Sequence, residues 1–308
     1  MKLDYPALSK EALCRLFGKT RHALYDRQKR GSTLNVRDEI VLQLVQNIRT
    51  DLPRIGTRKL LFMLQPVLES HRIKIGRDAL FELLADHGLL VRRRKRKVVT
   101  TDSRHWMRKY KNLLKDIHVH RPEQVWVSDI TYIKVGGSWG YLSMITDAYS
   151  RKIMGVGFRM DMYTEGCLTA LEMALSARCY NDQPLIHHSD RGAQYCSREY
   201  IDLLQKNQIA VSMTDKGDPY ENALAERMNG IIKSEFVLQT AVRDFSQTHE
   251  LIMQSVDAYN NLRPHGSCNY LTPAQAHLQL NELPKKWKSY PKKWQQKQTA
   301  QATETTAP

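Results

Sequence analysis

Residues 125–135 read VWVSDITYIKV, a β-rich run that predicts a strand. Gly136-Gly137 follows as the turn signal of a hairpin. Beyond this turn the expected elements are strands at 141–146, 152–158, 185–188 and 210–213, and helices at 164–177 and 197–206. Three hairpin-connected strands followed by strands that alternate with helices predict an α/β domain with a mixed five-stranded sheet and flanking helices.

Two carboxylates occupy unusual places in this pattern. Asp129 lies inside the otherwise apolar strand, where an unpaired charge costs on the order of several kcal/mol unless something compensates it. A bound cation is one compensation. Asp190 directly follows the strand at 185–188 and precedes a sharp turn. Because ligand sites gather at such strand ends in open α/β sheets, Asp190 is a second candidate for the same site.

Glu226 lies on a helix that we expect over 223–237. At about 100° per residue, Leu224, Met228 and Ile231 form one apolar stripe, and Glu226 shares the opposite face with Lys233. Hard divalent cations prefer carboxylate oxygens, and a pair of ions can activate one oxygen while stabilising another. For each acid alone, a surface or capping carboxylate is the better interpretation. The set of three favours a metal site.

Other polar side chains have plainer explanations. Asp147 could support the three acids, but a solvated carboxylate at a strand end is the preferred interpretation. His187 and His188, beside a strand end, are expected to be structural, and His265 is expected to anchor a loop. The loop TDKGDPYEN at 214–222 either orders on DNA or is simply solvated.

A formal charge of +15 is distributed unevenly along the 308 residues. Residues 1–120 hold 27 Lys and Arg against 12 Asp and Glu, whereas residues 121–308 hold 20 of each kind. This imbalance indicates a polyanionic partner, with nucleic acid as the leading candidate and a merely solvated surface as the alternative. Without a signal-peptide core or an apolar run of ~18 to 20 residues, we expect a cytoplasmic protein that does not enter membranes.

The cysteines carry no recognisable metal or disulfide pattern. None of them has CxxC spacing, which argues against a disulfide framework or a structural zinc site. We expect small buried or surface thiols. The five positions are Cys14, Cys167, Cys179, Cys196 and Cys268.

The basic front half has helical periodicity. Two short helices separated by Gly18-Lys19-Thr20 predict a helix-turn-helix over residues 1–32 that presents Arg21 and Arg27 to DNA. A plain helical hairpin is the alternative, and the charge favours DNA binding.

A second helical DNA-binding unit is expected over residues 33–98. Asn35 and Thr57 are candidate helix caps, and a third helix at 77–87 stops at Gly88. The unit ends in six consecutive cations, which can neutralise phosphates but cannot read sequence; a localisation signal or a solvated arm is the alternative. They are Arg92, Arg93, Arg94, Lys95, Arg96 and Lys97.

Three further segments complete the expected organisation. A linker helix over 99–121 leads into a catalytic core over 122–283. The tail, 284–308, carries Lys-Lys-Trp twice and is expected to be disordered. Its Lys-Lys-Trp copies could stack on DNA, and a solubilising tail is an equally good interpretation.

The acids and their surroundings resemble a known signature. Asp129, Asp190 and Glu226, with 35 residues between the last two, resemble the Asp-Asp-Glu pattern of retroviral integrases and bacterial insertion-sequence transposases. HSDRGAQY at 188–195, ENALAERMNGIIKSE at 221–235 and YNNLRPHGSCNYLTPAQA at 259–276 are similar to signature blocks of the insertion-sequence family called IS-three. The blocks occur in order and cover roughly residues 122–280, with a looser similarity over the front half.

The resemblance implies an α/β ribonuclease-H-like fold in which the three acids bind two magnesium or manganese ions and Lys233 meets the element-end DNA. Arg191, Tyr195 and Asn222 match motif positions and are expected at the active site or on DNA. One departure is the missing His-His-Cys-Cys zinc module of retroviral integrases, since Cys14 is the only cysteine of the front half.

The same resemblance implies partners and a reaction. The partners are the terminal inverted repeats, target DNA, further copies of the chain and an upstream-frame helix-turn-helix protein. The reaction is metal-dependent strand cleavage and strand transfer through a circular copy of the element. Two alternatives are a DNA-binding regulator with an inactive nuclease-like domain and a structure-selective nuclease that cuts but never joins. Intact acids at all three positions speak against the regulator.

Overall fold

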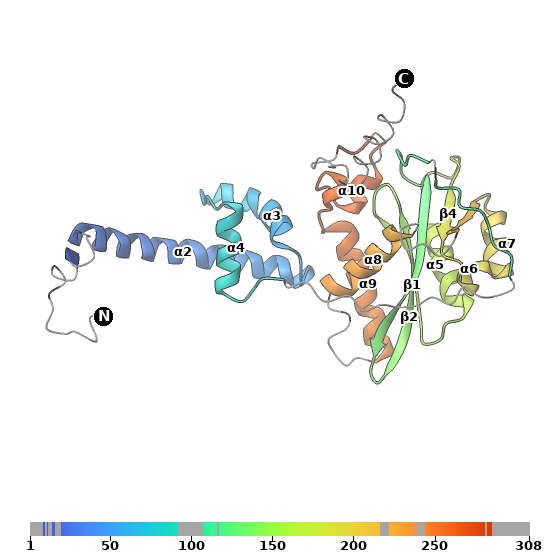
Figure 1. The fold of residues 1–308 in the computed structure, drawn as a ribbon, viewed down its shortest axis with the longest axis horizontal. Coiled ribbons are helices and arrows are strands. Elements are labelled where there is room, and N and C mark those ends of the chain that lie inside the picture. Colours follow the sequence, from blue (N-terminus) through green and yellow to red (C-terminus); the bar gives the residue numbers. More distant parts are fainter. Residues whose placement is uncertain are drawn as a thin grey trace, which may run out of the picture. The chain divides into compact units, whose positions relative to one another are not determined.

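The structure, a computed structural model, describes residues 20–91, 107–115, 117–215, 222–236, 244–280 and 282–284, together with residues 9, 11, 14, 15 and 238. The chain divides into two compact units (Figure 1). The first, the helical unit, is Met1–Val98 with Glu235–Val237, and the second, the α/β unit, is Val99–Ser234 with Leu238–Pro308.

A five-stranded sheet organises the α/β unit. Its order is β3-β2-β1-β4-β5, with the first three strands antiparallel and β4 and β5 parallel to β1. The mixed five-stranded sheet expected from the sequence is therefore confirmed. The strands are β1 (Val125–Val135), β2 (Ser138–Asp147), β3 (Ile153–Arg159), β4 (Ile186–Ser189) and β5 (Ala210–Met213).

Helices cover both faces of this sheet (Figure 1). On one side lie α5 (Thr164–Ser176), α6 (Ala193–Cys196) and α7 (Arg198–Lys206), and on the other lie α8 (Ala223–Glu235), α9 (Phe245–Asn261) and α10 (Pro273–His277). A 3-10 turn, Gly266–Cys268, connects the last two helices. The main apolar core lies beneath α5–α7 and includes Trp126, Ile145, Leu171 and Tyr200.

Two glycines of β3 allow α5 to approach the sheet closely. A Cβ on Gly155 would lie 1.9 Å from the carbonyl oxygen of Ala170, and one on Gly157 would lie 1.9 Å from that of Gly166. Glycine is needed at both positions because the helix backbone occupies the space of a side chain. The α5 helix is thereby fixed over the middle of the β2–β3 pair.

The segment before β1 departs from the sequence prediction. We expected a helix around residues 105–117, but the described residues 107–115 and 117–121 form no helix. This segment instead runs beside β5, where Leu113 N donates to Ser212 Oγ at 2.9 Å and Met213 N donates to Lys111 O at 3.4 Å. Tyr110 and Leu114 pack against the apolar clusters of the unit. Hydrogen bonds and burial offered by the sheet edge outweigh a weak local helix preference.

The described part of the helical unit comprises α2 (Arg21–Asp51), α3 (Thr57–Ser70) and α4 (Arg77–Asp86). Val41 and Val45 of α2 are fully buried, as are Leu60 of α3 and Leu80 and Leu84 of α4. These side chains form a small helical core. The expected end of α4 at Gly88 is confirmed, since Gly88 has a φ of +66° and its N–H bonds to Ala85 O.

The expected break within α2 is not present. The sequence predicted a helix-turn-helix ending at residue 32 and a new helix capped by Asn35, yet α2 continues from Arg21 to Asp51. An interior glycine such as Gly31 costs only about 1 kcal/mol, which is too little to end a helix by itself. Likewise Thr57 is not a cap, because the N-cap of α3 is Gly56.

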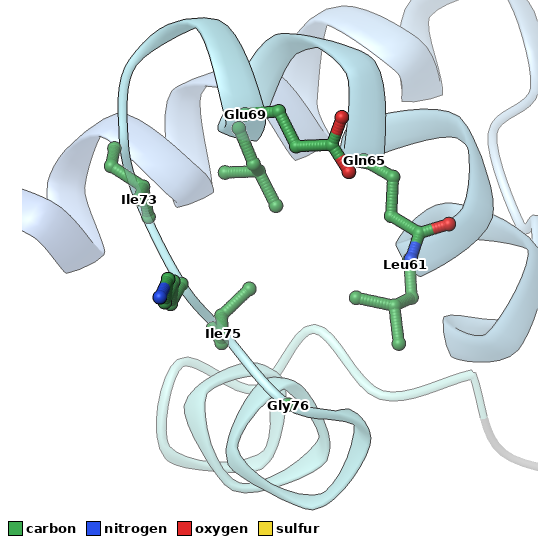
Figure 2. A pocket seen from close by; sticks show the side chains of 8 residues that line it. Leu61, Gln65, Glu69, Ile73, Ile75 and Gly76 are labelled. Carbon is green, nitrogen blue, oxygen red and sulfur yellow. The ribbon is translucent and has the colours of Figure 1, made fainter.

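A pocket of about 410 Å³ lies between α3 and the segment that leads into α4 (Figure 2). Leu61, Ile73 and Ile75 give it an apolar lining, and Glu69 is its only carboxylate. It holds no constellation of reactive groups, so the candidate active site lies elsewhere. Several expected segments lie wholly or mostly outside the described residues: the first helix and the turn at 18–19 of the expected helix-turn-helix, the basic arm at 92–97, residues 216–221 of the loop at 214–222, and the tail at 285–308.

Candidate active site

Asp129 sits in the middle of β1 and is partly buried. Its Oδ1 accepts a hydrogen bond from the N–H of Ile130 at 3.0 Å, and its Oδ2 accepts one from Nδ2 of Asn229 at 2.8 Å. Burial first, and then the neighbouring charges of Asp190 and Glu226, raise the pKa of Asp129 to about 7, although the Asn229 hydrogen bond acts to lower it. Asp129 therefore experiences both other acids electrostatically.

Asp190 reaches the same place from the neighbouring parallel strand. It directly follows β4, which pairs with β1 through Val127 and His188. Its Oδ1 accepts a hydrogen bond from the N–H of Gly192 at 2.9 Å, which closes the turn into α6. The sequence prediction that a strand end carries this acid is confirmed by the position of β4.

Three side chains, one just before α8 and two within it, hold the helix along β1. Asn222, just before the helix, donates from Nδ2 to the carbonyl oxygen of Ser128 at 2.9 Å. Asn229 donates to Asp129 as described, and Nζ of Lys233 donates to Oγ1 of Thr131 at 2.9 Å. These contacts place the first turn of α8, with the exposed Glu226, beside Asp129.

The buried face of α8 differs from the predicted stripe by one residue position. Ala225, Met228, Asn229 and Ile232 are buried, whereas Leu224 and Ile231 are only partly buried. The helix is rotated so that a polar asparagine enters the interface. Sequence reasoning missed Asn229, although its spacing of three from Glu226 and four from Lys233 places it on the same side of a helix.

The three acids share an environment without forming a closed cage. Among the described residues, the one group of three ligating side chains whose atoms all lie within 4.8 Å of one another is Glu123, Cys179 and His277, and not the Asp-Asp-Glu set. Asp129, Asp190 and Glu226 interact through their charges while keeping some separation. Such a set can accept cations between its members, because neighbouring carboxylates are stabilised by a positive charge placed among them.

The α/β unit matches known protein families. Integrase core domain families match residues 119–219 and 207–273. A 31 kDa protein of insertion element IS600 from Shigella sonnei is 32% identical over 276 residues, which cover 88% of this chain and 99% of that protein. The transposase for insertion sequence element IS629, also from Shigella sonnei, is 32% identical over 204 residues, 66% of this chain and 68% of that protein.

A third relative, transposase InsF for insertion sequence IS3A from Escherichia coli strain K12, is 32% identical over 166 residues, 53% of this chain and 57% of that protein. The chain belongs to the IS-three family of insertion-sequence transposases. The ribonuclease-H-like class expected for its core agrees with the observed strand order and directions.

Two residues of the transposase that we expected on DNA are buried. Tyr195 is 1% exposed and packs in the main core against His187 and Tyr200. Asn222 is 5% exposed and bonds to β1. Neither side chain presents an exposed surface to a phosphate or a base in this structure, and direct DNA contact by either one stays a prediction. Their position next to the acids is consistent with support of the site.

The other expected DNA contacts of the transposase stay predictions. Lys233 is half-buried, and burial lowers its pKa while Asp129 opposes that shift. Arg191 is partly exposed and lies 3.9 Å from Oδ1 of Asp215. Arg21 and Arg27 lie on α2, but their side chains are outside what the structure describes. The basic arm, Arg92 to Lys97, also lies outside it.

The histidines of β4 are structural, as expected. His187 is buried, and its Nε2 lies 2.8 Å from Oγ of Ser128 and 2.9 Å from the hydroxyl of Tyr200. Burial first, and then the neighbouring His188, lower the pKa of His187 to about 3, so the ring is neutral. Nδ1 of His188 lies 2.8 Å from Oγ of Ser212.

Asp147 corrects another expectation, because it is fully buried rather than solvated. It accepts hydrogen bonds of 2.7 Å from the N–H of Glu123 and from the N–H and hydroxyl of Ser150. Nδ1 of His277 lies 3.8 Å from its Oδ1. The carboxylate thus ties the β2–β3 turn to the start of β1 and to α10.

Glu123 and His277 extend this network. Nε2 of His277 lies 3.1 Å from Oε1 of Glu123. The same Oε1 accepts a hydrogen bond from the N–H of Cys179 at 2.8 Å, and Oε2 accepts one from the N–H of Tyr180 at 2.9 Å. A Glu–Cys–His set could hold a metal, but protein hydrogen bonds already occupy both carboxylate oxygens. We assign it a structural role.

The remaining expectations concern thiols and membranes. All five cysteines are free, four of them buried and Cys179 exposed, which confirms the expected small thiols. Among the described residues, no helix combines the length and the apolar character needed to cross a membrane.

Proposed function

We propose that this transposase is an Asp-Asp-Glu polynucleotidyl transferase that cuts DNA strands at the ends of an insertion sequence and joins them to new positions. The carrying observation is that the charges of Asp190 and Glu226 act on the half-buried Asp129, with the three acids supplied by two neighbouring strands and one helix of an integrase-type core. The transposases among its relatives support the same reaction class.

Divalent metal fits this donor set. All three side chains offer carboxylate oxygens, the ligands that magnesium and manganese prefer. Nζ of Lys233, on the same helix as Glu226, donates a hydrogen bond to Oγ1 of Thr131. We infer that Asp129, Asp190 and Glu226 would hold two Mg²⁺ or Mn²⁺ ions.

Each residue has a proposed task. Asn229 and the Ile130 N–H orient the two oxygens of Asp129, and the Gly192 N–H orients Asp190. A divalent cation on these acids would lower the pKa of the attacking oxygen and stabilise the leaving oxygen. Lys233 is placed to meet a DNA phosphate next to the acids.

The proposed reaction has two chemical steps of the same kind. An oxygen of water forms a new P–O bond at the element end, and the bond to the 3′-oxygen breaks, which releases a 3′-hydroxyl. That hydroxyl then attacks a second phosphodiester in line and displaces another 3′-oxygen. No bond to the protein forms in either step.

The partners follow from this reaction. We propose that the transposase binds terminal inverted repeats and target DNA in the bacterial cytoplasm, and that it acts as an oligomer because two ends must be held together. The basic front half, with residues 92–97, supplies phosphate contacts under this proposal. An upstream-frame helix-turn-helix partner is a further expectation.

The test uses terminal-repeat DNA in magnesium, with cleavage and joining scored separately. Asp190→Asn retains an acceptor for the Gly192 N–H but loses the charge, so we expect a folded protein that binds DNA and neither cuts nor joins. Asp182→Asn, at an exposed loop acid, is the matched control and should retain both activities. Unimpaired joining by Asp190→Asn would refute the assignment. Cutting without joining by the unaltered protein would indicate a structure-selective nuclease.

A further inference from the structure

An aromatic surface lies at the hairpin end of the sheet. In the β1–β2 register, Tyr132 pairs with Tyr141 and Lys134 pairs with Trp139. Residues directly opposite each other in an antiparallel pair point to the same face, so these four side chains lie on one side of the hairpin. With Tyr163, they make up what we call the aromatic surface.

The α5 helix leaves this surface uncovered. Helix α5 covers the same face of the sheet at Gly155 and Gly157 and begins at Thr164. Arg159, next on that face and paired with Tyr141, already lies against the first turn at Gly166. The hairpin continues past this point to Val135, and within the described part of the chain α5 does not extend over Lys134 and Trp139, which are exposed.

The rings are both exposed and held in place. Trp139 is 54% exposed and Tyr163 is 69% exposed. Tyr132 makes edge-to-face contacts with two neighbouring rings. Its ring centroid lies 6.5 Å from that of Trp139, with an angle of 85° between the ring planes, and 5.3 Å from that of Tyr141, with an angle of 60°. Such contacts fix ring orientation, so a planar ligand could stack without a large loss of side-chain freedom.

The surface continues into the neighbourhood of the acids. Tyr141 and Tyr163 line a small pocket together with Ile130 and Cys167. Ile130 directly follows Asp129, so the two side chains point to opposite faces of β1. The pairing of β1 with β4 ends at Val127, so among the described residues no strand lies along the edge of β1 that separates the two faces here. From the other side, Nε2 of Gln194, in the helix after Asp190, donates to Met162 O at 2.8 Å. The segment carrying Tyr163 is thus attached to the turn that bears the second acid.

We propose that the aromatic surface binds unstacked bases of the DNA strand whose phosphodiester lies at the three acids. This rests on the proposed function for the identity of the strand. Aromatic side chains stack on any base, and the exposed Lys134 beside Trp139 offers a cation for the adjoining phosphate. Arg159 is already neutralised by Asp161 through two 2.9 Å hydrogen bonds. Single-stranded or frayed DNA is therefore the ligand, rather than an intact duplex whose bases are stacked.

The first experiment measures binding in the full chain with metal chelated, so that it does not depend on catalysis. A fluorescent terminal-repeat duplex with a frayed end is compared with a fully paired one. For Tyr163→Ala and Trp139→Ala, affinity for the frayed end should fall by about fivefold to 100-fold, while affinity for the paired duplex stays the same. Tyr163→Phe and Trp139→Phe should restore binding, because a benzene ring still stacks.

A matched control and a direct contact assay complete the test. Leu278→Ala changes a side chain that is 71% exposed on another element and should leave both affinities unchanged. Photo-crosslinking from 5-iodouracil placed in the frayed strand should label residues 132–141 or 163. Equal binding by all variants, or crosslinks only elsewhere, would overturn the proposal. So would loss of self-association in Trp139→Ala with unchanged DNA binding, since a second copy of the chain would then be the occupant.

The two proposals fail separately. If Asp190→Asn remained active while Tyr163→Ala lost frayed-end binding, the assignment of the acids would be wrong and the base-binding surface would stand. If Asp190→Asn were inactive but every aromatic variant bound and joined normally, only the aromatic surface would be lost.

Discussion

Asn229 donates a 2.8 Å hydrogen bond from its amide Nδ2 to Oδ2 of Asp129, across the contact between α8 and β1. The asparagine is 5% exposed, so the bond is shielded from water. It is the one side-chain donor on Asp129 among the described residues, and it fixes the oxygen that faces the helix. Asn229 is therefore a positioning residue for a proposed metal ligand.

Removing this donor should weaken metal binding more than it weakens the fold. For Asn229→Ala we expect the magnesium concentration at half-maximal cleavage to rise about 10- to 100-fold, since residues that orient a ligand typically contribute that much. Activity titrated against magnesium measures it. Ser234→Ala, at an exposed position of the same helix, is the control. An unchanged magnesium requirement with a lowered melting temperature would assign Asn229 a merely structural role.

The Lys233–Thr131 pair gives a second prediction, about DNA. If Lys233 meets a phosphate, Lys233→Ala should weaken binding to all DNA sequences alike and should reduce the slope of log affinity against log salt by about 1. Thr131→Val removes only the internal acceptor and should keep the slope. Affinities measured between 50 and 200 mM salt, roughly the range in which such slopes are resolved, decide the matter; an unaltered slope in Lys233→Ala would argue against the contact.

The buried Glu123–His277 pair predicts a pH dependence of stability. Burial alone would raise the pKa of Glu123, but hydrogen bonds from His277, Cys179 and Tyr180 lower it overall from 4.5. Burial alone would lower the pKa of His277, but its interactions with Asp147 and Glu123 raise it overall from 6.5. Because its pKa is lowered, the ionised Glu123 stabilises the fold fully above pH 4.5. Because its pKa is raised, the protonated His277 stabilises the fold fully below pH 6.5.

We therefore expect this pair to contribute fully between these two values. Its contribution should fall in acid as Glu123 is protonated, and in base as the pH passes the folded-state pKa of His277. His277→Ala should cost about 3 to 5 kcal/mol of unfolding free energy at pH 5.5, because it removes the imidazolium between the buried carboxylates of Glu123 and Asp147. Urea unfolding at pH 5.5 and 8.5 measures this. The exposed His118→Ala should change little.

Gly157 gives a prediction about packing. Gly157→Ala would place a methyl group 1.9 Å from Gly166 O, so α5 must move away from the sheet. We expect the free energy of unfolding to fall by about 1 to 3 kcal/mol. Gly230→Ala is the matched control: it has open space and lies inside α8, so it should stabilise by about 0.5 to 1 kcal/mol. Equal stability of both variants would show that α5 packs less closely than described.

The succession of strands along the chain and the places of the acids within it could be predicted from the sequence. The run at 125–135 became β1, Asp190 follows β4, and Glu226 lies on α8, all as expected. These features are local, because alternation and strand ends depend on residues close together in the chain.

Predictions from local sequence patterns were wrong where residues distant in the chain determine the conformation or the burial. The segment at 107–121 is extended because β5 offers it hydrogen bonds, and Asp147 is buried because Glu123, Ser150 and His277 surround it. The burial of Tyr195 in the main core was likewise not visible in the local sequence pattern.

The sequence by itself thus determined the fold class, the excess of positive charge in the front half and the acids that belong together. Only the tertiary structure decided which side of α8 faces β1, and hence that Asn229 and Lys233 bond to Asp129 and Thr131. The reason is geometric: one residue turns a helix by about 100°, so its periodicity defines a face only to within a residue, and packing against a particular strand selects among the remaining orientations.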